Sequence, residues 1–325
     1  MWLNIIYIIL GFVLLVKGGD FLIDGAVAIA QRAKLSAMVI GITVVGFGTS
    51  MPELLVSTQA AWVGSSGLAI GNVAGSNIAN VALILGVTAL IHPLPSQRKM
   101  MRIDIPFMLF AMVLFIVMAF TNETIQRWQG VAMVLLLVGF ISWEVRQSRK
   151  ETKRMEAEGE AEAVVTPSMP LWRAILYVLV SLAAMVWGAD LLIDGSSNIA
   201  MELGEYFGVA KEEMERIIGL TIVAVGTSLP ELFASVMAAR KGETDMAVGN
   251  IIGSVSFNIL SVVGVASAIT PIHNAWTPFA IDYAVMFCLG LVLWLFLQTH
   301  HKIVRYEGAI LLTIYCLYIV KTLMG

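Results

Sequence analysis

Two long stretches of this 325-residue sequence are almost free of charge, and they decide what kind of protein the chain can form. Between Lys34 and Arg98 the only charged residue is Glu53, and no charged residue occurs between Asp245 and Asp282. A transmembrane helix needs about 20 apolar residues, so each stretch can supply more than one span. The composition agrees, with 58% hydrophobic and 13% charged residues. The sequence therefore predicts an integral membrane protein whose main partner is the lipid bilayer.

Apolar runs bounded by charged and turn residues predict ten spans. They are residues 3–31, 36–63, 68–91, 103–121, 126–144, 171–200, 214–239, 246–269, 278–298 and 303–323. The one long polar connection begins with basic residues and then turns acidic. It divides the chain into a first five-helix repeat (1–144), a linker (145–170) and a second five-helix repeat (171–325).

The two sets of five spans carry the same motifs in the same order. GGDFLIDGAVAIA (18–30) returns as GADLLIDGSSNIA (188–200), GFGTSMPEL (46–54) as AVGTSLPEL (224–232), and GNVAGSNIAN (71–80) as GNIIGSVSFN (249–258). Chance similarity between leucine-rich helices would not repeat glycine, proline and charged positions in order, so the chain contains an internal duplication. Because five spans is an odd number, the second copy must enter the membrane from the opposite side. The predicted fold class is an all-α polytopic membrane protein with ten transmembrane helices in two inverted five-helix repeats.

The distribution of basic residues predicts the orientation of this fold. Fifteen Lys and Arg lie in connections after odd-numbered spans, whereas the connections on the other side carry only Arg127, Lys211, Arg216 and Lys321. The positive-inside rule then places both termini outside, which is the periplasm for a bacterial inner membrane, and the 145–170 linker in the cytoplasm.

The GTSMPE and GTSLPE motifs predict a break in the middle of the second and seventh spans. Pro52 and Pro230 cannot donate a backbone hydrogen bond, so the carbonyl oxygens of Gly48 and Gly226 are expected to be freed. Such backbone is tolerated in a membrane only where protein or a water-filled cavity surrounds it. The breaks therefore predict a buried, oxygen-rich site that suits a hard cation. Its candidate ligands are the side chains of Thr49, Ser50, Glu53, Thr227, Ser228 and Glu231.

A structural interpretation of the same motifs is a capping box, in which a serine and the glutamate three residues later satisfy the amides that open a helix. Ser50 with Glu53, and Ser228 with Glu231, have that spacing. Capping explains the residue types but not why a costly ionisable group recurs at equivalent membrane positions. The two interpretations are compatible, because a cap can orient a ligand.

The GN motifs at the start of the third and eighth spans add neutral oxygens. Ser76 and Asn80, like Ser254 and Asn258, are four residues apart and share one helical face. The glycine pairs at 71/75 and 249/253 have the spacing that lets helices pack closely, which would press this face against the broken helices. These polar residues could equally hold the helices together by hydrogen bonds.

Other polar residues favour simpler roles. The repeated aspartates, Asp20, Asp24, Asp190 and Asp194, are interpreted as interfacial helix ends or gate contacts, and the four histidines as interfacial residues. Cys288 and Cys316 lie in apolar runs and indicate no disulfide framework, metal cluster or redox cofactor. The acidic part of the linker is interpreted as a solvated segment, and a regulatory calcium site is the alternative. Nothing indicates nucleic-acid binding.

In these motifs the sequence resembles the cation/Ca2+ exchanger superfamily, whose two alpha-repeats carry GTSxPE and GNxxGSNxxN signatures. The resemblance implies a secondary active antiporter, not an enzyme, that exchanges Ca2+ for Na+ across the bacterial inner membrane by alternating access at a midplane site. It places ion ligands on the ten residues Thr49, Ser50, Glu53, Ser76, Asn80, Thr227, Ser228, Glu231, Ser254 and Asn258. Cofactors other than the transported Ca2+ and Na+ are not implied.

The second repeat departs from the family pattern where GSVSFN replaces GSNxxD. Val255 stands in place of an asparagine, and Asn258 stands where K+-dependent members have aspartate, which argues against K+ cotransport. The GTSxPE form also differs from the GNxxE pattern of the proton-coupled branch, although exchange of Ca2+ or another cation for H+ remains the alternative. A cation channel is the rival from a different class, and an intramembrane hydrolase is disfavoured because no nucleophile–base pair occurs at that depth.

Overall fold

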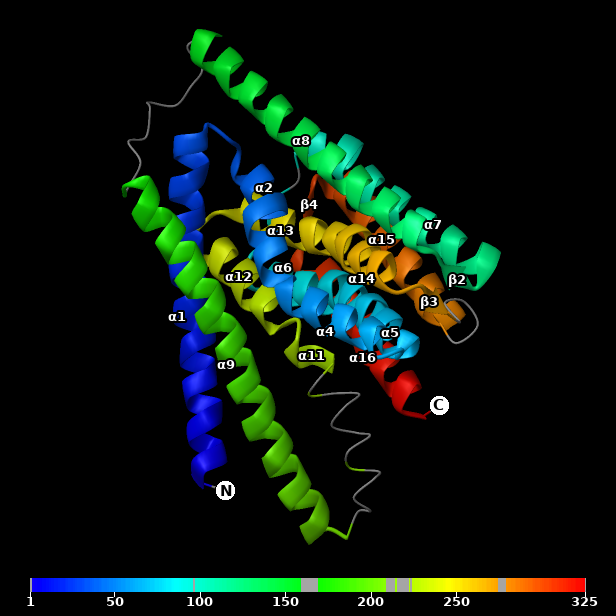
Figure 1. Cartoon of the computed structure of the whole chain (residues 1–325). Coiled ribbons are helices and arrows are strands. Elements are labelled where there is room, and N and C mark those ends of the chain that lie inside the picture. Colours follow the sequence, from blue (N-terminus) through cyan, green and yellow to red (C-terminus); the bar gives the residue numbers. More distant parts are fainter. Residues whose placement is uncertain are drawn as a thin grey trace.

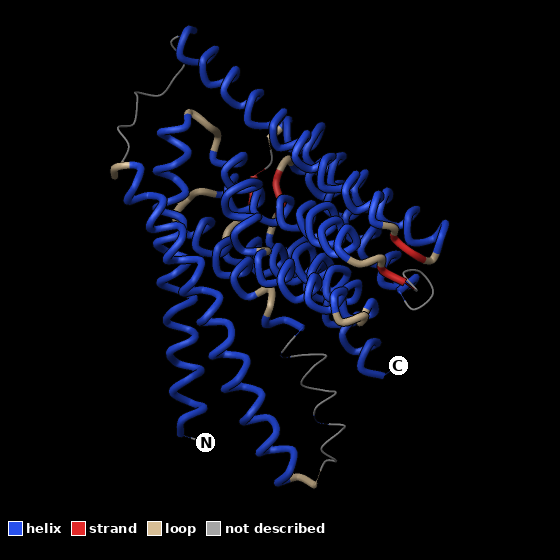
Figure 2. Tube along the Cα trace, in the orientation of Figure 1, coloured by secondary structure: helices blue, strands red, loops and turns tan. Residues whose placement is uncertain are grey.

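The computed structural model of the chain describes residues 2–95, 97–158, 169–208, 214, 222, 224–273 and 279–324. Figure 1 shows that the described chain is almost wholly helical, and Figure 2 shows that its strands are very short. The first repeat contains α1 (Trp2–Ala33), α2 (Ala37–Ile40), η1 (Gly41–Val45), α3 (Gly46–Thr49), α4 (Met51–Trp62), α5 (Ser66–Ile78), η2 (Ala79–Ile84), α6 (Leu85–Ile91), η3 (Met100–Asp104), α7 (Ile105–Asn122) and α8 (Arg127–Glu158). The second contains α9 (Leu171–Tyr206), α11 (Ala224–Gly226), α12 (Leu229–Arg240), α13 (Thr244–Phe257), η5 (Asn258–Val263), α14 (Gly264–Ile269), α15 (Ala280–His300) and α16 (Arg305–Met324). The segments labelled η are π-helical.

The predicted spans correspond closely to these elements. Within the described residues, seven helices are long and apolar enough to cross a membrane, and the pair 37–49 and 51–62, bent by 47°, makes an eighth. The tenth predicted span corresponds to α16. The seventh, 214–239, lies partly outside the described residues, and its described part contains α11 and α12.

The 145–170 connection is not a loop throughout. Helix α8 continues past the predicted end of the fifth span to Glu158, so the basic cluster from Arg146 to Arg154 lies on a helix that extends the span. The residues that follow the apolar run are mostly Arg, Lys, Gln and Glu, which favour helix, and this explains why the helix does not stop where the apolar run stops. The acidic stretch from 159 to 168 lies outside the described residues.

Helices α1 and α9 form an antiparallel pair along one side of the molecule (Figure 1). A Cβ atom added to Gly11 would lie 2.5 Å from the carbonyl oxygen of Gly188, and one added to Gly25 would lie 2.8 Å from that of Ala174. The later residue of α1 thus meets the earlier residue of α9, as expected for antiparallel helices. Glycine removes the side chains that would separate the helices, so the two backbones touch over several turns.

Two short strand pairs join the repeats and define their relative orientation. β1 (Leu94–Pro95), which follows the third span, pairs antiparallel with β4 (Lys302–Ile303) between the ninth and tenth spans. β2 (Thr124–Ile125), between the fourth and fifth spans, pairs with β3 (Ile272–His273) after the eighth. Connections three and nine therefore share one side, and connections four and eight share the other. This arrangement is the one that inverted repeats require.

The core of the molecule is formed by the third and eighth spans and the helices that pack on them. Helix α13 is the most enclosed, since every residue from Met246 to Phe257 is buried. Helix α8 packs on α14, α16 on α6 and α15 on α7, on the outside of this core. Large apolar side chains such as Leu135 and Trp187 are exposed on the outer helices, as expected for surfaces in contact with lipid.

Candidate functional site

The second and seventh spans are broken at equivalent serines, as predicted. Ser50, with φ −84° and ψ 7°, separates α3 from α4, and Ser228, with φ −92° and ψ 6°, precedes α12. Each following helix has its proline in the first turn, where the missing N–H costs no hydrogen bond. The expectation of an unpaired Gly48 carbonyl is wrong, because a backbone N–H group at the end of α3 donates to it. The last turn of α3 is tighter than an α-helical turn, and the Gly48 oxygen accepts a hydrogen bond within it.

The carboxyl groups of Glu53 and Glu231 are fully buried, one from each repeat. Among the described residues no basic side chain forms an ion pair with either glutamate. The hydroxyl of Ser76 lies 3.5 Å from Oε1 of Glu53, at the limit for donation, and the Oε2 atoms of both glutamates have no hydrogen-bond partner in the part of the chain that the structure describes. Buried carboxylates are stable only when they are paired, protonated or bound to a cation.

Ser50 connects the two repeats instead of capping its own helix. Its Oγ donates a hydrogen bond of 3.1 Å to Oε1 of Glu231, and no side-chain cap bond forms at Ser50 or Ser228. The capping-box interpretation is therefore wrong for these serines. The first repeat instead holds the carboxylate of the second, so the site belongs to the interface between the repeats.

Two asparagines that the sequence analysis did not select support the glutamates. Nδ2 of Asn72 donates to the backbone oxygen of Glu53 at 3.3 Å and to Oγ of Ser57 at 2.9 Å. Asn250 makes the same two bonds, at 3.3 Å to the Glu231 oxygen and at 2.9 Å to Oγ of Ser235. The signal was present in the sequence, since both asparagines are the N of the duplicated GN motif.

Three further predicted ligands, Thr49, Asn80 and Asn258, are fully buried. The Thr49 hydroxyl lies 3.1 Å from the Val45 carbonyl oxygen and 3.3 Å from Oδ1 of Asn250. Asn80 and Asn258 are fully buried, and neither atom of either side-chain amide has a hydrogen-bond partner among the described residues. Buried polar atoms without partners are rare, and here they leave donors and acceptors free for a ligand.

The equivalent serines and threonines of the two repeats do not sit alike. Ser254 is buried, but its Oγ lies 3.4 Å from the Gly46 carbonyl oxygen, whereas its counterpart Ser76 faces Glu53. Thr227 is half-buried and lines a cavity of about 410 Å³, together with Gly71, Gly75 and Asp282. The structure therefore breaks the symmetry of the duplicated motifs, because Thr227 lines a cavity whereas its counterpart Thr49 is fully buried.

Two π-helical segments mark the site, and sequence reasoning did not predict them. Segment η2 begins at Ala79, beside Asn80, and η5 begins at Asn258. A π-turn inserts a residue and interrupts the regular hydrogen-bond ladder, and such turns are frequent at functional sites. Here they lie at equivalent positions in the third and eighth spans, directly at the unpartnered asparagines.

The repeated aspartates lie away from the site, in agreement with their predicted simpler role. Nζ of Lys241, at the end of α12, donates to Oδ1 of Asp24 at 2.7 Å and to the backbone oxygen of Asp20 at 2.6 Å. Asp190 and Asp194 are exposed on α9. These contacts tie helix ends together and contribute no ligand to the buried pair.

The glycine pairs have different roles in the two repeats. A Cβ added to Gly249 would lie 2.6 Å from the Met38 carbonyl oxygen, and one added to Gly253 would lie 2.5 Å from that of Ile42. The predicted packing role is confirmed for this pair, which brings α13 against the second span. Gly71 and Gly75 instead line the 410 Å³ cavity.

Inverted repeats that meet at a buried acidic site between broken helices define the class of secondary transporters. The chain belongs to the sodium/calcium exchanger protein family, whose model matches residues 3–145 and 173–324. This membership confirms the predicted fold of ten helices in two repeats.

Individual relatives resemble the chain over nearly its full length. The sodium/calcium exchanger MaX1 of Methanosarcina acetivorans is 33% identical, covering 98% of this chain and 97% of that protein. The inner membrane protein YrbG of Escherichia coli is 33% identical, covering 88% and 86%. The sodium-calcium exchanger NCX_Mj, in crystals soaked with zero Na+ and Ca2+, matches with a TM-score of 0.80 and 30% identity over 98% of this chain and 99% of that one.

Proposed function

We propose that this protein is an antiporter that exchanges Ca2+ for Na+ across a membrane, and that it acts as a transporter and not as an enzyme. The observation that carries the proposal is the pair Glu53 and Glu231, fully buried without a basic partner in the described chain. Two negative charges in a protein interior must be balanced, and a surrounding of neutral oxygens favours a hard cation. The family membership makes Ca2+ and Na+ the ions to test first.

In this proposal Ca2+ and Na+ compete for one set of ligands. The carboxylates of Glu53 and Glu231 offset the two charges of one Ca2+, or are shared among several Na+ ions. Neutral oxygens complete the coordination, from Thr49, Ser50, Ser76, Asn80, Thr227, Ser228, Ser254 and Asn258. Ca2+ takes six to eight oxygen ligands in flexible geometry, so a site of many neutral oxygens and two carboxylates is suited to it.

Coupling follows from the cost of moving an empty site. Without ions the site holds two uncompensated charges, and exposing it to the other side of the membrane is then expensive. With either ion bound the charge is offset, and the two equivalent halves exchange conformations. After it releases one ion, the site must therefore bind the other before it can return to the first side of the membrane.

The expected location is the inner membrane, with both termini periplasmic and the 145–170 linker cytoplasmic. The membership of the inner membrane protein YrbG among the relatives and the basic connections after odd-numbered spans support this orientation. Tagging either terminus with a reporter that is active only in the cytoplasm would test it directly, since neither fusion should then be active.

The decisive experiment measures uptake of radioactive Ca2+ by proteoliposomes that contain the purified protein and are loaded with Na+. We expect rapid uptake when Na+ is absent outside and much slower uptake when Na+ is equal on both sides. Liposomes without protein, and liposomes loaded with K+, are the controls. Uptake that ignores the Na+ gradient would contradict Na+ coupling.

The same vesicles separate the rival functions. Uptake driven only by an imposed pH gradient would indicate a cation/proton antiporter. Uncoupled flux with single-channel conductance in a planar bilayer would indicate a cation channel. No Ca2+ flux under any gradient would reject Ca2+ as substrate.

Changing Ser50 to alanine should weaken Ca2+ binding about tenfold, because a hydrogen bond to a charged group contributes about 1.5–3 kcal/mol and 1.4 kcal/mol is a factor of ten. The variant removes the bond that holds Glu231 across the interface. Half-saturation by Ca2+ in the uptake assay is the measurement. Ser256→Ala is the matched control, since within the described residues this buried serine bonds only to the Ile252 carbonyl of its own helix. Equal effects of the two variants would contradict a role for Ser50 in the site.

A further inference from the structure

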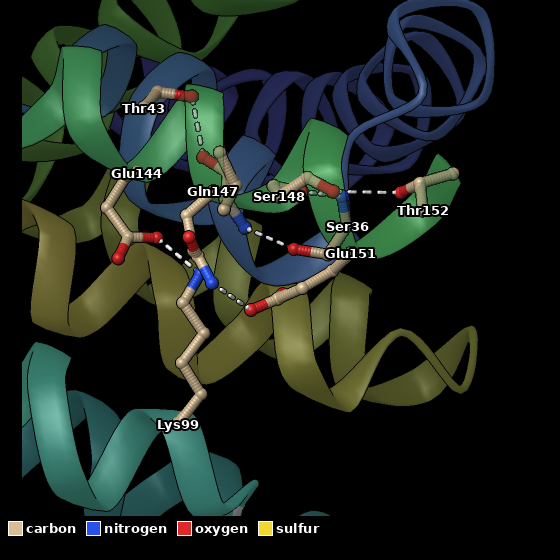
Figure 3. A network of polar contacts seen from close by, with 9 residues as sticks. Ser36, Thr43, Lys99, Glu144, Gln147, Ser148, Glu151 and Thr152 are labelled. Carbon is tan, nitrogen blue, oxygen red and sulfur yellow. Dashed lines mark hydrogen bonds and ion pairs between the residues drawn. The ribbon is translucent and has the colours of Figure 1, made fainter. Parts of the chain in front are cut away.

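A second buried acidic pair lies outside the proposed transport site, where η3 and α7 meet α8. Asp104, the last residue of η3, and Glu144, on α8, are both fully buried. Lys99 reaches the pair from the segment before η3, and its Nζ donates to Oε2 of Glu144 at 2.7 Å. Figure 3 shows Lys99 and Glu144 directed at each other, with Gln147 about one turn and Glu151 about two turns further along α8.

The hydrogen bonds of this pair are incomplete. Both carboxyl oxygens of Asp104 and Oε1 of Glu144 are buried without a hydrogen-bond partner among the described residues. Phe107, one turn after Asp104, stacks on Phe140, one turn before Glu144, with the ring centroids 3.6 Å apart, so the two carboxyl groups lie at the same contact between α7 and α8. Two ionised carboxylates cannot hydrogen-bond to one another, because neither has a donor.

The charges of the cluster do not balance either. Lys99 offsets one of the two buried carboxylates, and Glu151, the other charged group that acts on Asp104, is a third acid. An uncompensated carboxylate in a protein interior is costly enough that it takes up a proton or a cation. The pair of carboxyl groups therefore lacks one positive charge and one hydrogen-bond donor.

We propose that Asp104 and Glu144 form a proton-binding site that holds a single proton between the two carboxyl groups. One proton supplies the missing donor, completes the hydrogen bond between the carboxyls and leaves one negative charge for Lys99. This proton is a resident of the fold and is separate from the ions at Glu53 and Glu231.

The ligand is a proton and not a metal ion because the pair offers too few oxygens. Ca2+ needs six to eight oxygen ligands, whereas the two carboxyl groups supply four, and Oε2 of Glu144 is already bonded to Lys99. The ammonium of Lys99, bonded to Glu144, would also repel a metal ion at this position.

The site lies next to the helix that leads to the transport motifs. Oγ of Ser148, one turn after Glu144, accepts a 2.9 Å hydrogen bond from the backbone N–H of Ser36, which caps α2 (Figure 3). Helix α2 continues through η1 and α3 to the break at Ser50. A change in proton occupancy thus acts at the contact between α8 and the start of the second span.

Infrared spectroscopy of the purified protein tests the proposal, because a protonated carboxylic acid has a carbonyl band that a carboxylate lacks and that shifts in D2O. We expect Asp104→Asn and Glu144→Gln each to remove one such band at neutral pH, since either variant leaves one carboxylate for Lys99. Asp194→Asn, which changes an exposed aspartate on α9, should leave the spectrum unchanged.

A third variant reverses the direction of the effect. Lys99→Met removes the only positive charge of the cluster, so the pair should take up a second proton and the band should gain intensity. If Asp104→Asn does not fold, Glu144→Gln and Lys99→Met decide the question, since they must change the band in opposite directions. Full intensity in Glu144→Gln, or a band that Na+ or Ca2+ removes at fixed pH only when both residues are intact, would overturn the proposal.

Discussion

Changing Glu53 to glutamine is expected to reduce Na+-dependent Ca2+ uptake at least about 100-fold, more than the 10–100-fold that loss of a supporting group costs at a metal site. Glutamine keeps the size and one oxygen of the side chain but removes half of the negative charge of the site. A single remaining carboxylate cannot offset Ca2+, so the loaded site would carry an excess positive charge through the membrane. Glu231→Gln should have an effect of the same size, because the two glutamates are equally buried.

Uptake into Na+-loaded proteoliposomes is the measurement, with calorimetric titration of Ca2+ into the purified protein to separate binding from transport. Glu205→Gln, at an exposed position on α9, is the matched control and should behave like the unchanged protein. Exchange that survives in both Glu53→Gln and Glu231→Gln would remove the basis of the proposed function while leaving the proton-binding pair at Asp104 untouched.

Changing Gly253 to valine is expected to destabilise the fold by about 3 kcal/mol or more, at the upper end of the cost of overpacking. The added Cβ would meet the Ile42 carbonyl oxygen at 2.5 Å and the Ile42 Cα at 2.7 Å, and a backbone cannot rotate away as a side chain can. Helix α13 would be forced from the second span, which carries Thr49, Ser50 and Glu53.

Thermal unfolding in detergent, monitored by size-exclusion chromatography, measures this loss of stability. Gly139→Val is the control, because Gly139 is exposed on α8 and a Cβ added to it would meet no atom of the described chain within 4 Å. A Gly253 variant as stable as the Gly139 variant would contradict the close approach of α13 to the second span.

The sequence predicted the breaks and their acidic residues because both depend on local chemistry. Proline interrupts a helix wherever it occurs in the interior, and duplication showed that Glu53 and Glu231 occupy equivalent positions. The inverted topology followed from a count of spans. These features need no knowledge of how the helices pack.

The parts that the sequence could not predict depend on contacts between distant segments. Ser50 has the spacing of a cap to Glu53, and only the packed structure shows that it reaches Glu231 instead. The π-turns at Ala79 and Asn258 have no composition that separates them from α-helix. The prediction of an unpaired Gly48 carbonyl oxygen was wrong because it considered only the N–H group that Pro52 lacks. Another backbone N–H group at the end of α3 donates to that oxygen.

The bond from Ser50 to Glu231 has a consequence for how such a protein could have originated. Each repeat carries one acid, and an acid of the second repeat is held by a hydroxyl of the first. A five-helix ancestor would have held half of a site. It could complete that site only by pairing with a second copy of itself that was inserted into the membrane in the opposite direction. Fusion of the two genes would then have joined two halves that already assembled as separate chains.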